Sequence, residues 1–420
     1  MRLDQQSVAV RSSSLPPWLA EYRRRSFDAF EKLEMPREAE EVWRYLDLGF
    51  DLEDYETVEG PGDELGTADP IGDELAGVDR SLMVDGYLEQ AGSGAVMSLE
   101  AALDSDPGSI QRALEEGVPI DLDIFAAAHH AFSPDLAHVA SAPGSVGAHY
   151  IDVQSSTPAR ASFPHVVVDV GENAETSVVI GYRSANQTEL LVVPDVDISL
   201  AAGANCSLSV VQTWGDQTRA VSHVRARLGR DSSLTFAEAG LGSALSRLHL
   251  TIDLEGPGSE VSVLGLYFGE RDQVLDYRAF INHVGRSTTS DMLLKGAVED
   301  RARSVFTGLI KIWKNAIRAR AFQTNRNLVL SEGAQAQSVP TLEILCDDVM
   351  CGHASASGPL DPDQLYYLRS RGLSRPRAER MLMGAFFNQV LERFPASAVA
   401  GPVRAELSRK FMAAQEEGRV

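Results

Sequence analysis

Two cysteines and one histidine whose side chains suit metal binding lie close together near residue 350. Cys346 and Cys351 stand on either side of two aspartates, and His353 follows shortly after. A thiolate and an imidazole can share a soft or borderline metal ion. If residues 341–351 are extended, side chains alternate between faces, so Cys351 and His353 point to one side and Cys346 to the other. Two ligands are too few for a closed site, so the pattern predicts a half-site that needs ligands from elsewhere.

The same residues also have a purely structural interpretation, which the local sequence leaves open. Cys351 can be a small buried side chain, and His353 can be a hydrogen-bonded residue of a turn. We interpret Cys346 and the third cysteine, Cys206, as structural. Three cysteines are an odd number and too few for a disulfide framework, which is typical of a reducing compartment.

Acidic residues outnumber basic ones in this sequence, with 60 Asp and Glu against 38 Lys and Arg and a formal net charge of -22. Such a charge disfavours nucleic acid and anionic lipid, so we expect neither as a partner. No apolar run approaches the roughly 20 residues that cross a bilayer. The first residues lack the apolar region of a secretory signal, so we expect a cytoplasmic location. A length of 420 residues predicts several subdomains or one elongated repeat body.

Residues 1–146 are predicted to form an N-terminal helical and mixed region. We expect a disordered start over residues 1–15, a helix over 16–35 that opens with two prolines, and a second helix over 38–46. An acidic stretch rich in glycine and proline, about residues 51–75, has no hydrophobic period and predicts a linker.

Two adjacent histidines lie in the last helix predicted for this region. His129 and His130 project about 100° apart, so the two alone cannot easily chelate one ion. We interpret them as ordinary core or surface histidines. The elements predicted between the linker and residue 146 are a strand at 81–87 and helices near 99–103, 110–114 and 123–132.

The middle of the sequence is built from short runs of β-branched residues bounded by turn residues. Units that begin with a turn and continue as a strand start at Gly203, Gly229, Gly256 and Gly285, which are 26, 27 and 29 residues apart. One period of this size, without intervening helices, indicates a stacked β-solenoid. The single repeat length disfavours the alternative of a twisted β-sandwich. We therefore predict a mainly β protein with its core over residues 147–358, whose end turns must be capped or paired.

The last part of the sequence, residues 359–420, returns to helical patterns. Apolar residues recur at helical spacing from Ala378 to Val390, and a third helix is expected after Pro402. Gly372 is expected to end the first of these helices. Short helices attached to a β body can also serve as a docking module for a partner.

Several common catalytic signatures are absent from the sequence. It contains neither a phosphate-binding GxxxxGK[ST] loop nor a GxGxxG dinucleotide fingerprint. It also lacks an HExxH motif, a CxxC pair and a GxSxG nucleophile elbow. A polysaccharide lyase or hydrolase built on a β-solenoid, which could work with scattered carboxylates, stays open as an alternative.

The motifs of the C-terminal half resemble those of the SufB/SufD family of the SUF iron–sulfur cluster assembly system. The segments that carry the resemblance are STTSDMLLKG (287–296), SVFTGLIKI (304–312), AFQTNRNLVLSEGAQAQSVPTLEI (321–344), DDVMCGHASASGPLD (347–361) and QLYYLRSRGL (364–373). Near the N-terminus, EEVWRYLDL (40–48) is similar to the family's E-x-W-R-Y-T segment, with Leu46 in place of the threonine.

Two positions make the chain more similar to SufD than to SufB. Cys351-Gly352-His353 resembles the C-x-H of SufD, whereas SufB-like chains carry E-H-E there. Asn325 stands where SufB-like chains have the cysteine regarded as the scaffold nucleophile. The resemblance therefore argues against the alternative of a SufB-like homodimeric scaffold that holds a cluster alone.

The resemblance implies a right-handed parallel β-helix flanked by N- and C-terminal helical regions. It implies a non-catalytic subunit that pairs with SufB through the β-helix and docks the SufC ATPase through residues 359–420. His353, with Cys351 nearby, would bind iron or a transient iron–sulfur cluster shared with SufB at their interface. Flavin is linked to the family's complexes, but the sequence shows no flavin fingerprint and we assign no flavin residues. Whether a homodimer forms without SufB stays open.

Overall fold

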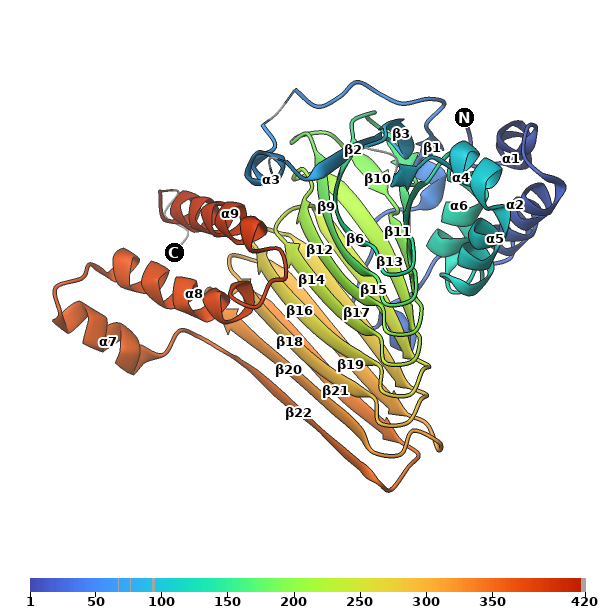
Figure 1. Ribbon diagram of the computed structural model, residues 1–420. Helices are drawn as coiled ribbons and strands as arrows, with labels where there is room; N and C mark the ends of the chain where they lie inside the picture. Colours follow the sequence, from blue (N-terminus) through green and yellow to red (C-terminus); the bar gives the residue numbers. More distant parts are fainter. Residues whose placement is uncertain (67, 76, 93–94, 417–420) are drawn as a thin grey trace.

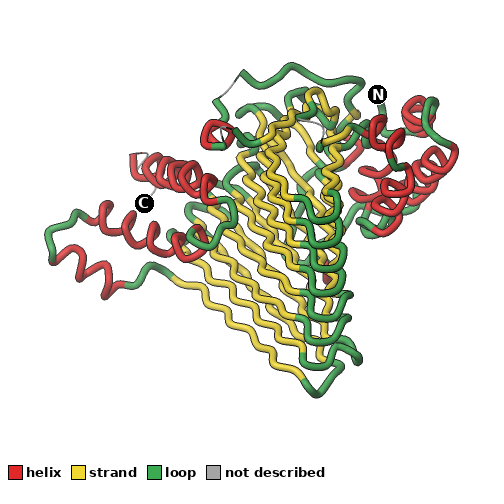
Figure 2. Tube along the Cα trace, viewed as in Figure 1, coloured by secondary structure: helices red, strands yellow, loops and turns green. Residues whose placement is uncertain are grey.

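A computed structural model of the chain describes residues 1–66, 68–75, 77–92 and 95–416. Residue 67 of the predicted linker and residues 417–420 of the predicted C-terminal region lie outside the described residues. The centre of the molecule is a parallel β-solenoid in which successive strands alternate between two stacked sheets (Figures 1 and 2). The predicted fold class, a mainly β protein with a β-helical core and helices at both ends, is confirmed.

The strands of the two sheets follow one another along the solenoid in a regular order. The main path of the first sheet runs through β4 (Val96–Met97), β5 (Ala137–Ser141), β8 (His165–Val170), β11 (Asp195–Leu200), β13 (Thr218–Leu228), β15 (Leu245–Leu254), β17 (Val274–His283), β19 (Arg303–Ile312) and β21 (Gln335–Ile344). Short strands β1 (Glu56–Thr57), β7 (Arg160–Ser162) and β10 (Leu190–Val192) join its side. The second sheet runs through β3 (Tyr87–Gln90), β2 (Asp79–Val84), β6 (Val146–Ser155), β9 (Glu175–Ser184), β12 (Asn205–Thr213), β14 (Ser233–Gly240), β16 (Glu260–Gly269), β18 (Thr289–Val298), β20 (Ala319–Val329) and β22 (Val349–Gly358).

The register of the strands explains the repeat seen in the sequence. Ser233 pairs with Glu260, and Glu260 pairs with Thr289, so one turn of the solenoid takes 27 and then 29 residues. The turns between the sheets need a left-handed backbone, which glycine adopts freely and Asn or Asp tolerate. Gly203 and Gly258 have φ of +69° and +75° at this place. Because the solenoid turns are similar in length, each strand pairs in parallel with the corresponding strand of the next turn.

The space between the two sheets is filled by the inward side chains of each strand. Through most of the solenoid these are aliphatic and aromatic residues that form one continuous core, such as Ile198, Leu208, Phe236 and Ile281. Burial of this apolar surface is the main source of stability for each turn. This packing fixes the positions of the inward side chains in each turn of the solenoid.

Most of the N-terminal helices cover the outer face of the first sheet, whereas the short helix α3 packs on the second sheet through Ile71 (Figure 1). The aromatic side chains of Phe27, Phe125 and Phe163 form part of the apolar layer beneath them. The helices of this region are α1 (Gln5–Ser12), α2 (Pro17–Phe30), α3 (Pro70–Glu74), α4 (Leu99–Ser105), α5 (Pro107–Glu116) and α6 (Ile124–Phe132), with the 3-10 turns η1 (Glu41–Trp43) and η2 (Leu52–Asp54).

Two of the three C-terminal helices pack on the outer face of the second sheet. Helices α8 (Arg375–Leu391) and α9 (Ser397–Glu416) share an apolar cluster with strands β16 and β18, in which Phe387 meets Leu264 and Leu266. Helix α7 (Pro362–Ser370) has no buried residue and projects from the body beyond β22 (Figure 1). Among the described residues no helix is long and apolar enough to cross a membrane.

Three local predictions are wrong. The expected disordered start contains helix α1, because the carboxylate of Asp4 caps it by accepting the Ser7 backbone N–H at 2.9 Å. The expected helix over 38–46 is only the single turn η1, with Trp43 buried in the core. Helix α9 begins at Ser397, so Pro402 lies inside the helix, where it removes one hydrogen bond of the ladder, and does not precede the helix as expected.

The strand predicted at 81–87 is divided between β2 and β3, which pair antiparallel. Asp85 and Gly86, both with positive φ, form the turn between them. This hairpin closes one end of the second sheet, and the short antiparallel strand β4 closes the same end of the first sheet. One end of the solenoid is therefore capped by strands of the opposite direction.

Candidate functional site

Cys351 and His353 lie on β22, the last strand of the second sheet, with their side chains toward the interior of the solenoid. Their partners across the ladder are Ala321 and Gln323, both buried at 1% exposure or less. The next inward residue, Ser355, meets Ser338 of β21 across the interior, with 2.8 Å between their hydroxyl oxygens. The prediction that Cys351 and His353 share a face agrees with this register.

Cys346 does not lie on an extended segment together with Cys351, so the predicted opposition of the two cysteines is wrong. Strand β21 ends at Ile344, and the chain turns before β22 begins at Val349. Cys346 lies in this turn, where both cysteines pack against the inner core. Cys206 is buried in the same core, as expected, and burial raises the pKa of its thiol to about 12.

The site is open because, in the described ranges, no further turn of the solenoid follows β21 and β22. Within the described part of the chain, β21 pairs only with β19 in the ladder, and β22 only with β20. His353 is therefore exposed although it points to the interior, and Cys351 is half-buried. Figure 1 shows β22 as the free margin of the sheet, opposite the capped end. We call this margin, β21 and β22 with their inward residues, the open end.

Polar side chains line the interior just below the open end, whereas the inward side chains of earlier turns are mostly aliphatic and aromatic. Tyr267 donates its hydroxyl to the side-chain oxygen of Asn327 at 2.5 Å, and Asn327 donates to Asn325 at 2.8 Å. Asn327 also reaches the hydroxyl of Ser357 on β22, at 3.3 Å. Asn325, at the position of the scaffold cysteine in SufB-like chains, is 1% exposed and part of this network. The interior therefore changes from apolar to hydrogen-bonding as it approaches the open end.

The open end supplies only part of a metal coordination shell. Residues two apart on a strand are separated by about 6.6 Å along it, so Cys351 and His353 can approach one ion or cluster from the same side. In the described ranges the only group of three or more metal-ligand side chains lies elsewhere, so the pair has no third His, Cys, Asp or Glu ligand beside it. The arrangement is compatible with the half-site that the sequence predicts, and metal binding there stays a prediction.

Apolar side chains surround the opening. Phe322, Ile344 and Met350 are large apolar residues that are 42%, 44% and 58% exposed. Such side chains gathered beside two unpaired strand edges are typical of a surface that meets another protein.

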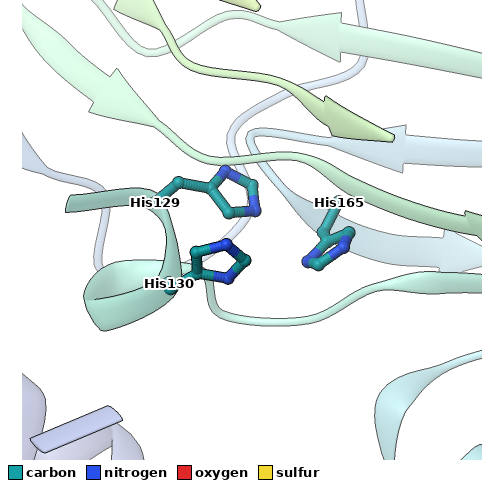
Figure 3. A group of neighbouring side chains, drawn as sticks. All are labelled: His129, His130 and His165. Carbon is teal, nitrogen blue, oxygen red and sulfur yellow. The ribbon is translucent and has the colours of Figure 1, made fainter. Parts of the chain in front are cut away.

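The one group of three metal-ligand side chains among the residues that the structure describes was missed by the sequence analysis. His129 and His130 of α6 lie beside His165, the first residue of β8, with ligand atoms within 4.8 Å of one another (Figure 3). All three are buried, and burial lowers the pKa of His129 and of His130. The sequence offers no signal for this meeting, because His165 lies 35 residues after His130 and on another element.

Comparison with known proteins gives one matching family and several similar proteins. The family described as "SUF system FeS cluster assembly, SufBD core domain" matches residues 152–386, which run from the end of β6 through the whole open end into α8. This match covers more than half of the chain.

The similar proteins carry related names. The "Iron-sulfur cluster assembly protein SufD" of Bacillus subtilis is 27% identical over 94% of both chains. The protein of that name from Escherichia coli is 28% identical over 58% of both chains. An "Iron-sulfur cluster assembly SufBD family protein" of Mycobacterium leprae is 32% identical over 58% of this chain. That match spans about two thirds of the mycobacterial relative, 65% of its length.

Proposed function

This chain belongs to the SufBD family of the SUF iron–sulfur cluster assembly system, and from that premise we propose that it is a SufD-like, non-catalytic subunit of the assembly scaffold. It pairs with SufB through the open end of its solenoid. His353 and Cys351 hold iron or a nascent cluster together with ligands of SufB. The C-terminal helices dock the SufC ATPase, which supplies ATP hydrolysis. The cluster is cargo that is built and passed on.

The unpaired edges of β21 and β22 support the pairing with SufB. An edge strand exposes backbone N–H and C=O groups that only another strand can satisfy regularly, and proteins rarely leave a long flat edge uncovered. Both edges here are 10 residues long, and exposed apolar side chains lie beside them. A partner that ends in a matching solenoid turn would continue both sheets by strand addition.

The incomplete ligand set of the open end supports a shared cluster site. A thiolate and an imidazole are ligands for iron and iron–sulfur clusters, and two of them cannot enclose an ion. His353 is exposed and has room to reach across an interface, whereas Cys351 lies deeper, against the core. We therefore assign His353 as a ligand and Cys351 as its neighbour in the same site.

The position of α7 supports the docking of SufC at the C-terminal region. Tyr366 and Tyr367 on this helix are 76% and 55% exposed, and no residue of α7 is buried. Exposed tyrosines are enriched in protein interfaces because they contribute a large contact area at little entropic cost. Helices α8 and α9 would then connect the docked ATPase to the second sheet.

The observation that carries the proposal is the half-site at the open end of a SufBD-family solenoid. To test it, the chain is co-expressed anaerobically with SufB and SufC, and iron, acid-labile sulfide and visible absorption of the purified complex are measured. His353→Ala should lower bound iron and sulfide on the order of tenfold while the complex still assembles.

Ser355→Ala is the matched control, because Ser355 is the next inward residue of the same strand and is also exposed. It should keep the iron and sulfide of the wild type. Equal iron and sulfide in His353→Ala and wild type would show that His353 is structural. Cluster binding by the chain purified without SufB would instead favour a homodimeric scaffold.

A further inference from the structure

Far from the open end, three histidines and one aspartate converge where helix α6 packs on the first sheet. His165 and Asp195 are the first residues of β8 and β11, and they lie side by side in the ladder. His129 and His130 come from α6, which lies over this part of the sheet (Figure 3). The ring centroids of His129 and His165 are 4.9 Å apart, and those of His129 and His130 are 5.4 Å apart.

Each histidine is oriented by a hydrogen bond from one ring nitrogen. His129 donates from Nδ1 to the carbonyl of Val193 at 2.7 Å, and His130 donates from Nε2 to the carbonyl of Val118 at 2.9 Å. His165 Nε2 lies 3.0 Å from a carboxylate oxygen of Asp197. Carbonyl and carboxylate oxygens only accept, so these nitrogens carry the hydrogen, and the second nitrogen of each ring presents a lone pair. Metal-binding histidines are held in this way.

Asp195 faces two of these rings with an oxygen that has no hydrogen-bond partner. Its Oδ2 is 3.7 Å from Nε2 of His129 and 3.6 Å from Nε2 of His130, which is too long for a hydrogen bond. Asp195 is completely buried, and its Oδ2 and the Nε2 of His129 both lack a hydrogen-bond partner. Its other oxygen, Oδ1, accepts from Nδ1 of His223 at 2.9 Å.

A buried carboxylate oxygen opposite an imidazole lone pair is unfavourable without a cation or a hydrogen between them. The spacing fits a cation. Four N and O ligands at about 2.0 to 2.2 Å from a tetrahedral ion lie about 3.4 Å from one another. The separation of 3.7 Å between Oδ2 of Asp195 and Nε2 of His129 is close to this value. Nε2 of His130 carries the hydrogen donated to Val118, so this ring offers its Nδ1, which also lacks a hydrogen-bond partner.

We propose that His129, His130, His165 and Asp195 bind one Zn²⁺ ion in a closed, structural site. Three imidazoles and one carboxylate are a ligand set that suits zinc, and four protein ligands in a fully buried place leave no open position for catalysis. The ion joins α6 of the N-terminal region to β8 and β11 of the solenoid. It is distinct from the iron or cluster of the open end and does not depend on the function proposed above.

The test is the metal content of the full chain, purified from zinc-sufficient cells and measured by inductively coupled plasma mass spectrometry. Close to one zinc per chain is expected in the wild type, and a strong chelator should remove it during unfolding and lower the melting temperature on refolding. His129→Gln should lose the zinc. Refolding the wild-type chain with Co²⁺ should give the visible absorption of a tetrahedral site.

Two control variants locate the ion. His249→Gln replaces another buried histidine on the same face of the first sheet, one strand beyond His223, and should keep the zinc. His353→Ala at the open end should also keep it. A wild-type chain that contains no zinc and takes up neither Zn²⁺ nor Co²⁺ on refolding would overturn the proposal, even if His129→Gln fails to fold. Zinc retained by His129→Gln, or iron in its place, would overturn it too.

Discussion

At the scale of single residues, the interior of the solenoid holds a carboxyl group among apolar side chains. Glu238 of β14 points inward between Val210 and Gly265 of the neighbouring strands. Its Oε2 has no hydrogen-bond partner, and burial raises its pKa from 4.5 to about 8. A carboxyl group with a raised pKa is held in the neutral form, so Glu238 is tolerated in the core only while it keeps its proton.

The raised pKa of Glu238 predicts a pH-dependent stability. Below pH 4.5 the group is protonated in both the folded and unfolded chain, and between pH 4.5 and about 8 only the unfolded chain releases the proton. The free energy of unfolding therefore falls across this window, by an amount on the order of 4 kcal/mol. Glu238→Gln removes this loss, so its melting temperature should exceed that of the wild type increasingly from pH 5 to pH 8. A difference in melting temperature between Glu238→Gln and wild type that stays constant from pH 5 to pH 8 would contradict a raised pKa of Glu238.

At the scale of elements, the two end strands β21 and β22 differ from every strand inside the ladder. An internal strand of the solenoid satisfies its backbone on both sides and buries its inward side chains, whereas these two strands have one neighbour each within the described residues. At the opposite end, short antiparallel strands occupy the edges. Because one end is capped and the other is not, β21 and β22 are the strands to which we assign the proposed interface.

A charge placed at the open end should therefore weaken pairing without unfolding the chain. Ile344 is 44% exposed at the end of β21, so Ile344→Lys costs little in the isolated protein. In the complex the lysine would be buried without a partner, and we expect binding of SufB to weaken on the order of tenfold, measured by co-purification and size-exclusion chromatography. Val146→Lys, at an 80% exposed position of β6, is the matched control and should bind as the wild type does. Unchanged binding by Ile344→Lys would place the interface elsewhere.

At the scale of the whole molecule, helices cover parts of both outer faces of the solenoid and so limit the surfaces that a partner can reach. Most of the N-terminal helices cover the first sheet, and α8 and α9, with α3 beside them, cover part of the second (Figure 2). The buried Lys410 of α9 pairs with Glu270, which follows strand β16. The open end and helix α7 are left as neighbouring exposed surfaces, so the two proposed partners would bind close to each other.

Removal of the C-terminal region should separate the two partners. A chain truncated after Asp361 should lose co-purification of SufC, because the proposed docking helices are gone, and should retain SufB at the open end. Because truncation also uncovers the apolar cluster under α8, the double variant Tyr366→Ala/Tyr367→Ala tests the same surface with the fold intact. Val10→Ala, an exposed apolar position on α1, is its control. Retention of SufC by both the truncated chain and the double variant would refute this docking site.

The sequence by itself determined the solenoid and the shared face of Cys351 and His353. Turn residues at one period fix the length of each turn, and alternation along a strand places Cys351 and His353 on one face, since both signals are local. The local signal failed at Cys346, because a turn that interrupts the alternation follows Ile344. It also failed over residues 38–46, where packing of Trp43 into the core outweighs helical spacing.

Only the tertiary structure decided which distant residues meet and which edges stay free. His165 and Asp195 become neighbours because β8 and β11 stack one turn apart, and α6 brings His129 and His130 over them by packing its apolar residues on the sheet. No pattern in the sequence predicts that these four residues lie close together, because their proximity depends on how the solenoid turns and helix α6 pack. The exposure of His353 likewise follows from the end of the ladder, which is a property of the assembled sheets.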